Sequence, residues 1–185
     1  MNQWTVFKYV LPVTALLALL YVAGCTNSND RQSDTRIGVE ELQTQGRQMP
    51  SFNLPSPLSG GTAVSSGSLE GKVLLVSFFA SWCRSCLEEI PLLKKMQDRY
   101  DDQEFSIIAI AVDRENEQGL KNLIQKQGIN YPVLLADEAV KKDFGGIAIL
   151  PTMFLINREG ILMKKYSGHF ERDSLIRDIE QTLNL

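Results

Sequence analysis

Residues 73–86 read VLLVSFFASWCRSC, and the fold follows from this stretch. Its first seven residues are almost continuously apolar, which is typical of a central strand that is covered on both faces. After the C-x-x-C motif, apolar residues recur at helical spacing. They are Leu87, Ile90, Leu93, Met96 and Tyr100. The two cysteines therefore lie where a buried strand passes into a helix.

The sequence on both sides of this stretch predicts an α/β domain. A strand over residues 105–112 completes a β-α-β unit with a parallel sheet. Further helices are expected to end near residue 128 and at residues 145–146, and an amphipathic helix over residues 175–183 closes the chain. Turn residues indicate two hairpins. Their strands are expected over residues 51–54 and 62–65, and over residues 152–156 and 161–166.

The N-terminal residues are typical of an export signal. Residues 9–24 carry no charge, and this run of about 16 residues is shorter than the ~20 that a transmembrane helix needs. It ends in Val22-Ala23-Gly24-Cys25, which resembles the lipobox of bacterial lipoproteins. The resemblance implies cleavage before Cys25 and a lipid on that cysteine. An uncleaved signal anchor is the alternative, and with either the rest of the chain lies outside the cytoplasm, tethered to a membrane.

We divide the chain into a signal peptide over residues 1–24, a lipid-anchored flexible tether over residues 25–48 and a folded domain over residues 49–185. The tether has few apolar residues and no strand alternation, so it is expected to be solvated. The chain has 19 Lys and Arg against 22 Asp and Glu, and no basic run that would neutralise a phosphate backbone. We therefore expect no nucleic-acid partner.

The two cysteines of the motif suit redox chemistry. Cys83 lies at a helix N-terminus, where unpaired N–H groups and the helix dipole favour a thiolate, so it is the candidate nucleophile. Cys86 lies one turn further in and is expected to face the core, which suits the resolving thiol of a disulfide exchange. The alternative is that the C-x-x-C motif supplies two of the four ligands of a zinc site. Zinc needs four ligands, and with Cys25 assigned to the lipid only His169 remains, so we expect no metal and no cofactor and give His169 no role.

Together these features resemble the TlpA/ResA-type thiol-disulfide oxidoreductases of the thioredoxin-like superfamily. The resemblance rests on Gly71-Lys72, on FFASWCRSC at residues 78–86, on LEEIP at residues 87–91 and on ILPTMFLINREG at residues 149–160. It implies a thioredoxin-like α/β fold, with a central mixed sheet flanked by helices, an N-terminal β-hairpin, and a helical insertion over residues 114–144.

The resemblance also implies a substrate-binding segment. It identifies Pro151 as the cis-proline that faces the cysteines, where Leu150, Pro151 and Thr152 pair with a substrate strand. A trans proline at the start of a strand is the alternative. Trp82 is expected to be an exposed lid beside the disulfide, although an aromatic residue at a strand end can also cap a core.

Glu89 occupies the position where the family carries a buried carboxylate. There it would exchange a proton with Cys86 and raise the pKa of that thiol. The alternative, a charge favoured by the helix dipole in the first turn, stays open. Ser77 stands where cytosolic thioredoxins have a buried aspartate, and a serine cannot accept a proton near neutral pH. This leaves Glu89 or solvent as the acceptor.

The sequence thus predicts a membrane-anchored, extracytoplasmic disulfide reductase. Cys83 attacks a substrate disulfide, Cys86 resolves the mixed disulfide, and a membrane thiol donor reduces the pair again. The family resemblance suggests apocytochrome c or another exported protein as substrate, and we expect a monomer. Two alternatives remain: a disulfide oxidant or isomerase on the same fold, and a Sco-type copper metallochaperone, which uses C-x-x-x-C with a distal histidine.

Overall fold

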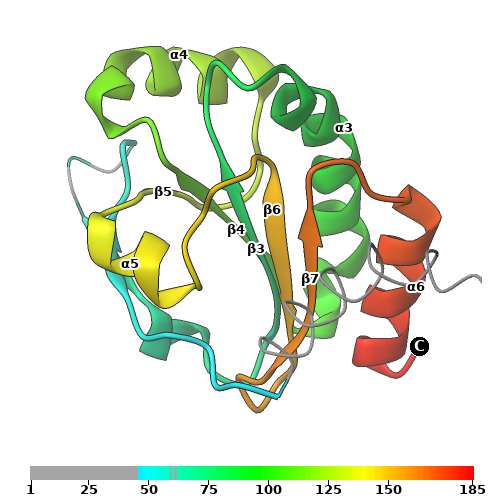
Figure 1. The fold of residues 1–185 in the computed structure, drawn as a ribbon. Helices are drawn as coiled ribbons and strands as arrows, with labels where there is room; N and C mark the ends of the chain where they lie inside the picture. The colour runs from blue at the N-terminus through cyan, green and yellow to red at the C-terminus, as the bar shows by residue number, and fades with distance from the viewer. Residues whose placement is uncertain (1–45, 59, 61) are drawn as a thin grey trace, which may run out of the picture. The chain divides into compact units, whose positions relative to one another are not determined.

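The computed structural model describes residues 46–58, 60 and 62–185 (Figure 1). The expected signal peptide, Cys25 and nearly all of the expected tether lie outside the described residues. Within the described part of the chain, no helix is both long enough and apolar enough to cross a membrane.

A central mixed sheet of five strands has the order β5-β4-β3-β6-β7. β3 lies in the middle, parallel to β4 and antiparallel to β6, and all seven of its residues are buried. The strands are β3 (Val73–Phe79), β4 (Phe105–Ala111), β5 (Val133–Leu135), β6 (Thr152–Ile156) and β7 (Leu162–Ser167). The continuous apolar run at residues 73–79 is therefore the fully covered strand that the sequence predicted.

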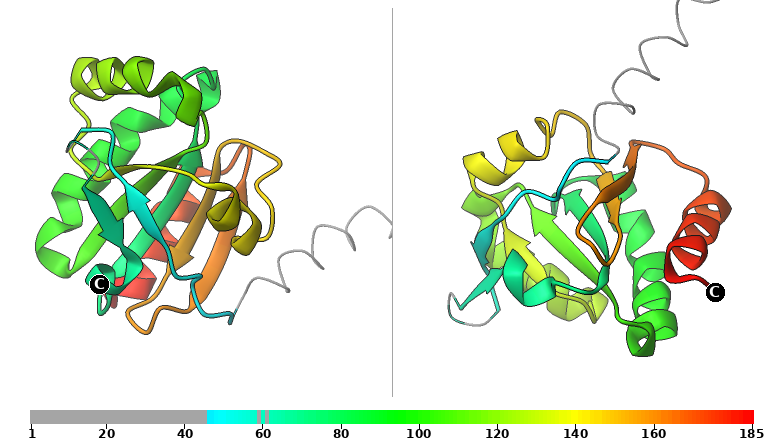
Figure 2. Two further views of the ribbon diagram at one scale, coloured as in Figure 1. Left: turned by 90° about the vertical axis from the view of Figure 1, so that its left-hand side faces the viewer. Right: turned by 90° about the horizontal axis from the view of Figure 1, so that it is seen from below.

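Helices cover both faces of this sheet. They are α3 (Arg84–Tyr100), α4 (Glu117–Gln127), α5 (Glu138–Asp143) and α6 (Arg172–Leu183), with short 3-10 turns over Ser66–Leu69, Asp101–Gln103 and Arg114–Asn116. Apolar side chains of α3, α4 and α6 pack on the face that carries Val73 and Leu75, and those of α5 pack on the face that carries Leu74 and Val76. The right-hand view of Figure 2 shows the sheet between these layers.

A small antiparallel hairpin, β1 (Asn53–Pro55) and β2 (Ala63–Ser65), precedes the central sheet. Its residue Leu54 packs with the α5 layer. Upstream of it, the amide of Gly46 donates to the Leu162 carbonyl at 2.9 Å, and the amide of Met49 donates to the Gly160 carbonyl at 2.7 Å. The chain is therefore bound to the β6–β7 turn from residue 46 onward.

The architecture is the predicted one, with one addition. Residues 114–144, expected as a helical insertion, contain α4 and α5 and also the edge strand β5 between them. This strand extends the sheet beside β4, in the register Ala109 to Val133. It spans Val133–Leu135, and a run of three apolar residues is too short for periodicity to separate a strand from a helix.

Candidate active site

The C-x-x-C motif lies at the N-terminus of α3, directly after the central strand. Cys83 is the N-cap residue, and its sulfur accepts a hydrogen bond from the Cys86 amide at 3.3 Å. The two cysteines form a disulfide with their Cα atoms 5.3 Å apart. Cys83 is 7% exposed and Cys86 is 3% exposed, so Cys86 is the more buried residue of the two. The chemical roles of both stay predictions.

The segment between β3 and α3 forms a tight turn beside the buried disulfide. The amide of Cys83 donates to the Ala80 carbonyl at 3.1 Å, which closes a tight turn before the helix. Trp82, inside this turn, is 71% exposed. Arg84 is exposed and pairs with Glu88 one helical turn later at 3.1 Å. Trp82 is thus the side chain of this turn that is most available to a partner, in keeping with the expected lid.

Glu89 follows Cys86 by about one turn of α3 and borders a small cavity of about 10 Å³. The polar residues that line this cavity with it are Ser77, Cys86 and Tyr131. Burial raises the pKa of Glu89 to about 7, and the positive charge of Arg172 opposes that shift. The half-buried Glu89 therefore shares a cavity with Cys86, the more buried of the two cysteines.

Tyr131 is a cavity residue that the sequence analysis did not identify. It precedes β5, and it is buried against the side of α3 that carries Glu89. Burial raises the pKa of its hydroxyl, and the negative charge of Glu89 raises it further. The tyrosine was missed because it belongs to the approach to β5, the strand that was not predicted.

Asp113 is a second residue that sequence reasoning missed. Because β3 and β4 are parallel with Phe79 opposite Ala111, the residues that follow both strands meet at one edge of the sheet. There one carboxylate oxygen of Asp113 accepts hydrogen bonds from the amide of Ser81, at 2.9 Å, and from its hydroxyl. The sequence did offer one signal: Asp113 comes two residues after β4, the strand that pairs with β3.

The segment around Pro151 lies at this same edge. The Leu150–Pro151 peptide bond is cis, as the resemblance implies, and the pairing of Phe78 with Thr152 brings the segment beside the end of β3. The Pro151 carbonyl accepts from the Gly168 amide at 2.8 Å, and the Thr152 hydroxyl donates to the Ile149 carbonyl at 2.7 Å. By contrast, neither the amide nor the carbonyl of Leu150 bonds to another described residue.

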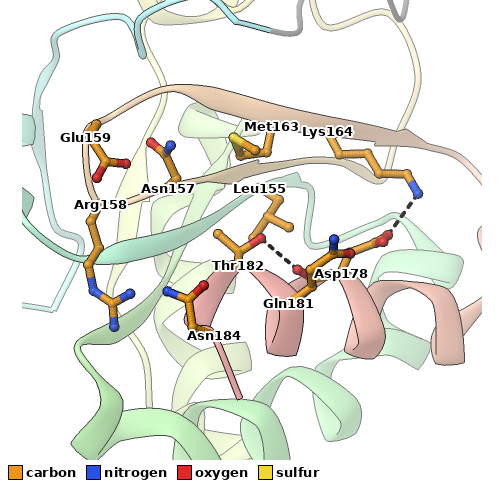
Figure 3. Close-up of a pocket in the computed structure, with 10 residues that line it drawn as sticks. All are labelled: Leu155, Asn157, Arg158, Glu159, Met163, Lys164, Asp178, Gln181, Thr182 and Asn184. Carbon is orange, nitrogen blue, oxygen red and sulfur yellow. Dashed lines mark hydrogen bonds and ion pairs between the residues drawn. The ribbon is translucent and has the colours of Figure 1, made fainter.

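Two remaining features lie apart from the motif. His169 is exposed, and the described part of the chain has no cluster of three or more His, Cys, Asp or Glu side chains suited to a metal. A pocket of about 440 Å³ lies between the β6–β7 hairpin and α6 (Figure 3). Its lining includes Lys164 and Asp178, which form an ion pair at 2.8 Å, but no residue of the motif and none of residues 150–152.

Comparisons with known proteins agree with this geometry. The model of the Redoxin family matches residues 44–183. The chain is 30% identical over 163 residues to the thiol-disulfide oxidoreductase ResA of Bacillus subtilis, covering 88% of this chain and 86% of that protein. A thioredoxin-like protein of the same bacterium, YneN, is 25% identical over 173 residues, covering 91% of this chain and 95% of its own length.

Among solved structures, a thioredoxin-family thiol:disulfide interchange protein from Chlorobium tepidum superposes with a TM-score of 0.68 and 33% identity. The match covers 75% of this chain and 97% of that one. A second protein of that bacterium, described as a putative thiol:disulfide interchange protein DsbE, has the same TM-score of 0.68 at 25% identity, with the same coverage of 75% and 97%.

Proposed function

The chain belongs to the Redoxin family and is a thiol-disulfide oxidoreductase, and on this premise we propose that it is a membrane-anchored, extracytoplasmic reductase of disulfides in exported proteins. One observation carries the proposal: Cys86, which forms the disulfide with Cys83, shares a cavity with Glu89, whose pKa is raised to about 7. A carboxyl group that titrates near neutral pH can take up and release the protons that thiol exchange requires.

The reaction proceeds in two exchanges. The Cys83 thiolate attacks one sulfur of a substrate disulfide, so that a bond forms to Cys83 while the substrate S–S bond breaks and the leaving thiolate takes up a proton. The Cys86 thiolate then attacks the sulfur of Cys83 and releases the second substrate thiol. The substrate disulfide gains two electrons and two protons, and the pair loses them. A membrane protein with a dithiol returns the pair to its reduced form.

Glu89 accepts the proton of the Cys86 thiol during the second exchange. Cys86 is buried, so its thiol needs a base inside the protein, and the Ser77 hydroxyl cannot serve near neutral pH. A cavity of about 10 Å³ has room for roughly one water molecule between the two groups. The shared cavity favours this role over that of a surface charge.

The substrate binds as an extended strand beside the disulfide. The Leu150 amide and carbonyl form no hydrogen bond with the described residues, which leaves them open to β-strand addition, and apolar side chains flank the site. These are Trp82, 71% exposed, and Ile149, 56% exposed. A surface of this kind accepts a strand from apocytochrome c or another exported protein that carries a disulfide. Pro151 and Thr152 position Leu150 from the start of β6.

A trapping experiment tests the proposal. The Cys86→Ser variant lacks the resolving thiol, so it is expected to accumulate mixed disulfides between Cys83 and exported proteins in cells. Non-reducing gels followed by mass spectrometry identify the trapped proteins. The Cys83→Ser variant is the matched control and should trap none. Equal trapping by both variants, or by neither, would show that Cys83 is not the attacking thiol.

A further inference from the structure

The strongest feature outside the proposed chemistry is the buried carboxyl group of Asp113. Asp113 is 7% exposed, and one of its carboxylate oxygens accepts hydrogen bonds from both the amide and the hydroxyl of Ser81. The Asn116 side-chain amide donates to the same Ser81 hydroxyl at 3.1 Å. Three hydrogen bonds thus hold one residue of the turn that leads into Cys83.

The second oxygen of Asp113 is buried without a hydrogen-bond partner in the described structure. Such an atom is costly, because burial removes its water and nothing replaces it. No ion pair of the described residues includes Asp113. Holding Ser81 in place needs only the oxygen that accepts its two hydrogen bonds. The second, unpartnered oxygen therefore points to a role for the negative charge of Asp113 itself.

This charge lies close to the redox pair. The Ser81 amide is 2.9 Å from the carboxylate, and two residues of chain span at most about 7 Å, so the carboxylate is within roughly 10 Å of the Cys83 amide. Other charged side chains near the pair are Arg84 and Glu88, which are exposed and paired with each other. Glu89 lines the same cavity as Cys86, and the positive charge of Arg172 acts on Glu89.

We propose that Asp113 is a positioning residue of the redox site: through Ser81 it fixes the turn that carries Cys83, and its charge disfavours the Cys83 thiolate. The inference rests on the proposed function, because it assumes that Cys83 is the attacking thiol. A nearby negative charge destabilises a thiolate but not a disulfide. Asp113 therefore shifts the equilibrium toward the disulfide and makes the reduced pair a stronger reductant.

The test measures the equilibrium of the pair with glutathione in the full-length protein, scored by alkylation of the free thiols. Asp113→Asn removes the charge and keeps an oxygen for the Ser81 amide. It is expected to shift the equilibrium about three- to tenfold toward the dithiol, and tenfold corresponds to about 30 mV. Glu115→Gln removes an exposed charge two residues away and is expected to change the equilibrium less than twofold.

Two more variants separate charge from scaffolding. Ser81→Ala keeps the charge and the amide hydrogen bond, so its equilibrium is expected to stay within twofold of wild type. Asn116→Asp adds a carboxylate beside Ser81 from an exposed position, and it is expected to shift the equilibrium toward the disulfide. This variant supplies the decisive comparison should Asp113→Asn fail to fold.

The outcomes distinguish this inference from the proposed function. In one outcome, the wild-type pair exchanges with glutathione while Asp113→Asn and Asn116→Asp leave the equilibrium unchanged or shift it in the directions opposite to those expected. That result overturns the role of Asp113 and leaves the proposed function standing. A wild-type pair that does not exchange at all overturns both.

Discussion

Glu89 is the residue on which the proton transfers of the pair depend. Its pKa is raised to about 7 by burial, with Arg172 acting in the opposite direction. The group is therefore mostly protonated at pH 6 and mostly ionised at pH 8, and only the ionised form accepts the Cys86 proton. The rate of the resolving step should accordingly rise with pH through about 7.

Replacing Glu89 with glutamine removes this proton acceptor. The Glu89→Gln variant is expected to resolve a mixed disulfide roughly 100-fold more slowly at pH 8 than wild type, which is a typical loss for a general base. The rate should also lose its dependence on pH around 7. Stopped-flow kinetics with a disulfide peptide measure both effects.

Glu88→Gln is the matched control, because Glu88 is the neighbouring carboxylate and is exposed. It is expected to keep the wild-type rate and pH profile. An equal loss in both variants, or an unchanged pH profile in Glu89→Gln, would contradict the role given to Glu89.

The same pKa shift links Glu89 to the stability of the domain. Its folded-state pKa, about 7, lies above the ordinary value of 4.5, so between these values the folded state binds more protons than the unfolded state. The free energy of unfolding should therefore fall as pH rises from 4.5 to 7. In urea unfolding, the free energy of unfolding of Glu89→Gln should not fall over this pH range. An equal fall in both proteins would show that another group causes it.

At the scale of elements, a hydrogen-bond cluster on Asp178 attaches α6 to β7. Its carboxylate accepts from Lys164 at 2.8 Å, from the Tyr166 hydroxyl at 2.6 Å and from the Ser174 hydroxyl at 3.4 Å. Burial acts to raise the pKa of Asp178, but the hydrogen bonds and the charge of Lys164 together lower it below its ordinary value. The cluster thus stabilises the ionised form.

Asp178→Ala is expected to lower the free energy of unfolding by about 1–3 kcal/mol, because it removes a carboxylate that accepts three hydrogen bonds from partly buried groups. The wild-type advantage is present above the unfolded pKa of 3.8 and is lost as pH falls through the lower folded-state value. Urea unfolding at neutral and acid pH measures it. Asp102→Ala, at an exposed aspartate, is the control, and an equal loss there would contradict the account.

The elements that the sequence predicted well are those with strong local signals. The apolar run of β3 and the helical spacing of apolar residues in α3 each indicate their own structure. β5 was missed because its three apolar residues do not by themselves indicate a strand, and the pairing with β4 makes it one. Asp113 and Tyr131 were missed for a related reason, since their contacts with Ser81 and with the Glu89 cavity depend on sheet order.

At the scale of the whole molecule, the proposed function joins a redox domain to a membrane anchor. The lipid on Cys25 and the removal of residues 1–24 remain predictions from the sequence. The Cys25→Ala variant is expected to leave the membrane fraction while keeping the redox equilibrium of the purified protein, because Cys83 and Cys86 form their disulfide without a third thiol. Cell fractionation measures the first effect, and full retention in the membrane would contradict a lipid anchor.

The proposed function requires that the Cys83–Cys86 pair acts as a reductant. The most direct test is its equilibrium reduction potential, measured in the purified protein against dithiothreitol and glutathione buffers. A reductase of this kind is expected to have a potential near or below about -250 mV, within reach of a membrane dithiol donor. A potential near -120 mV would contradict it and would make the protein a disulfide oxidant.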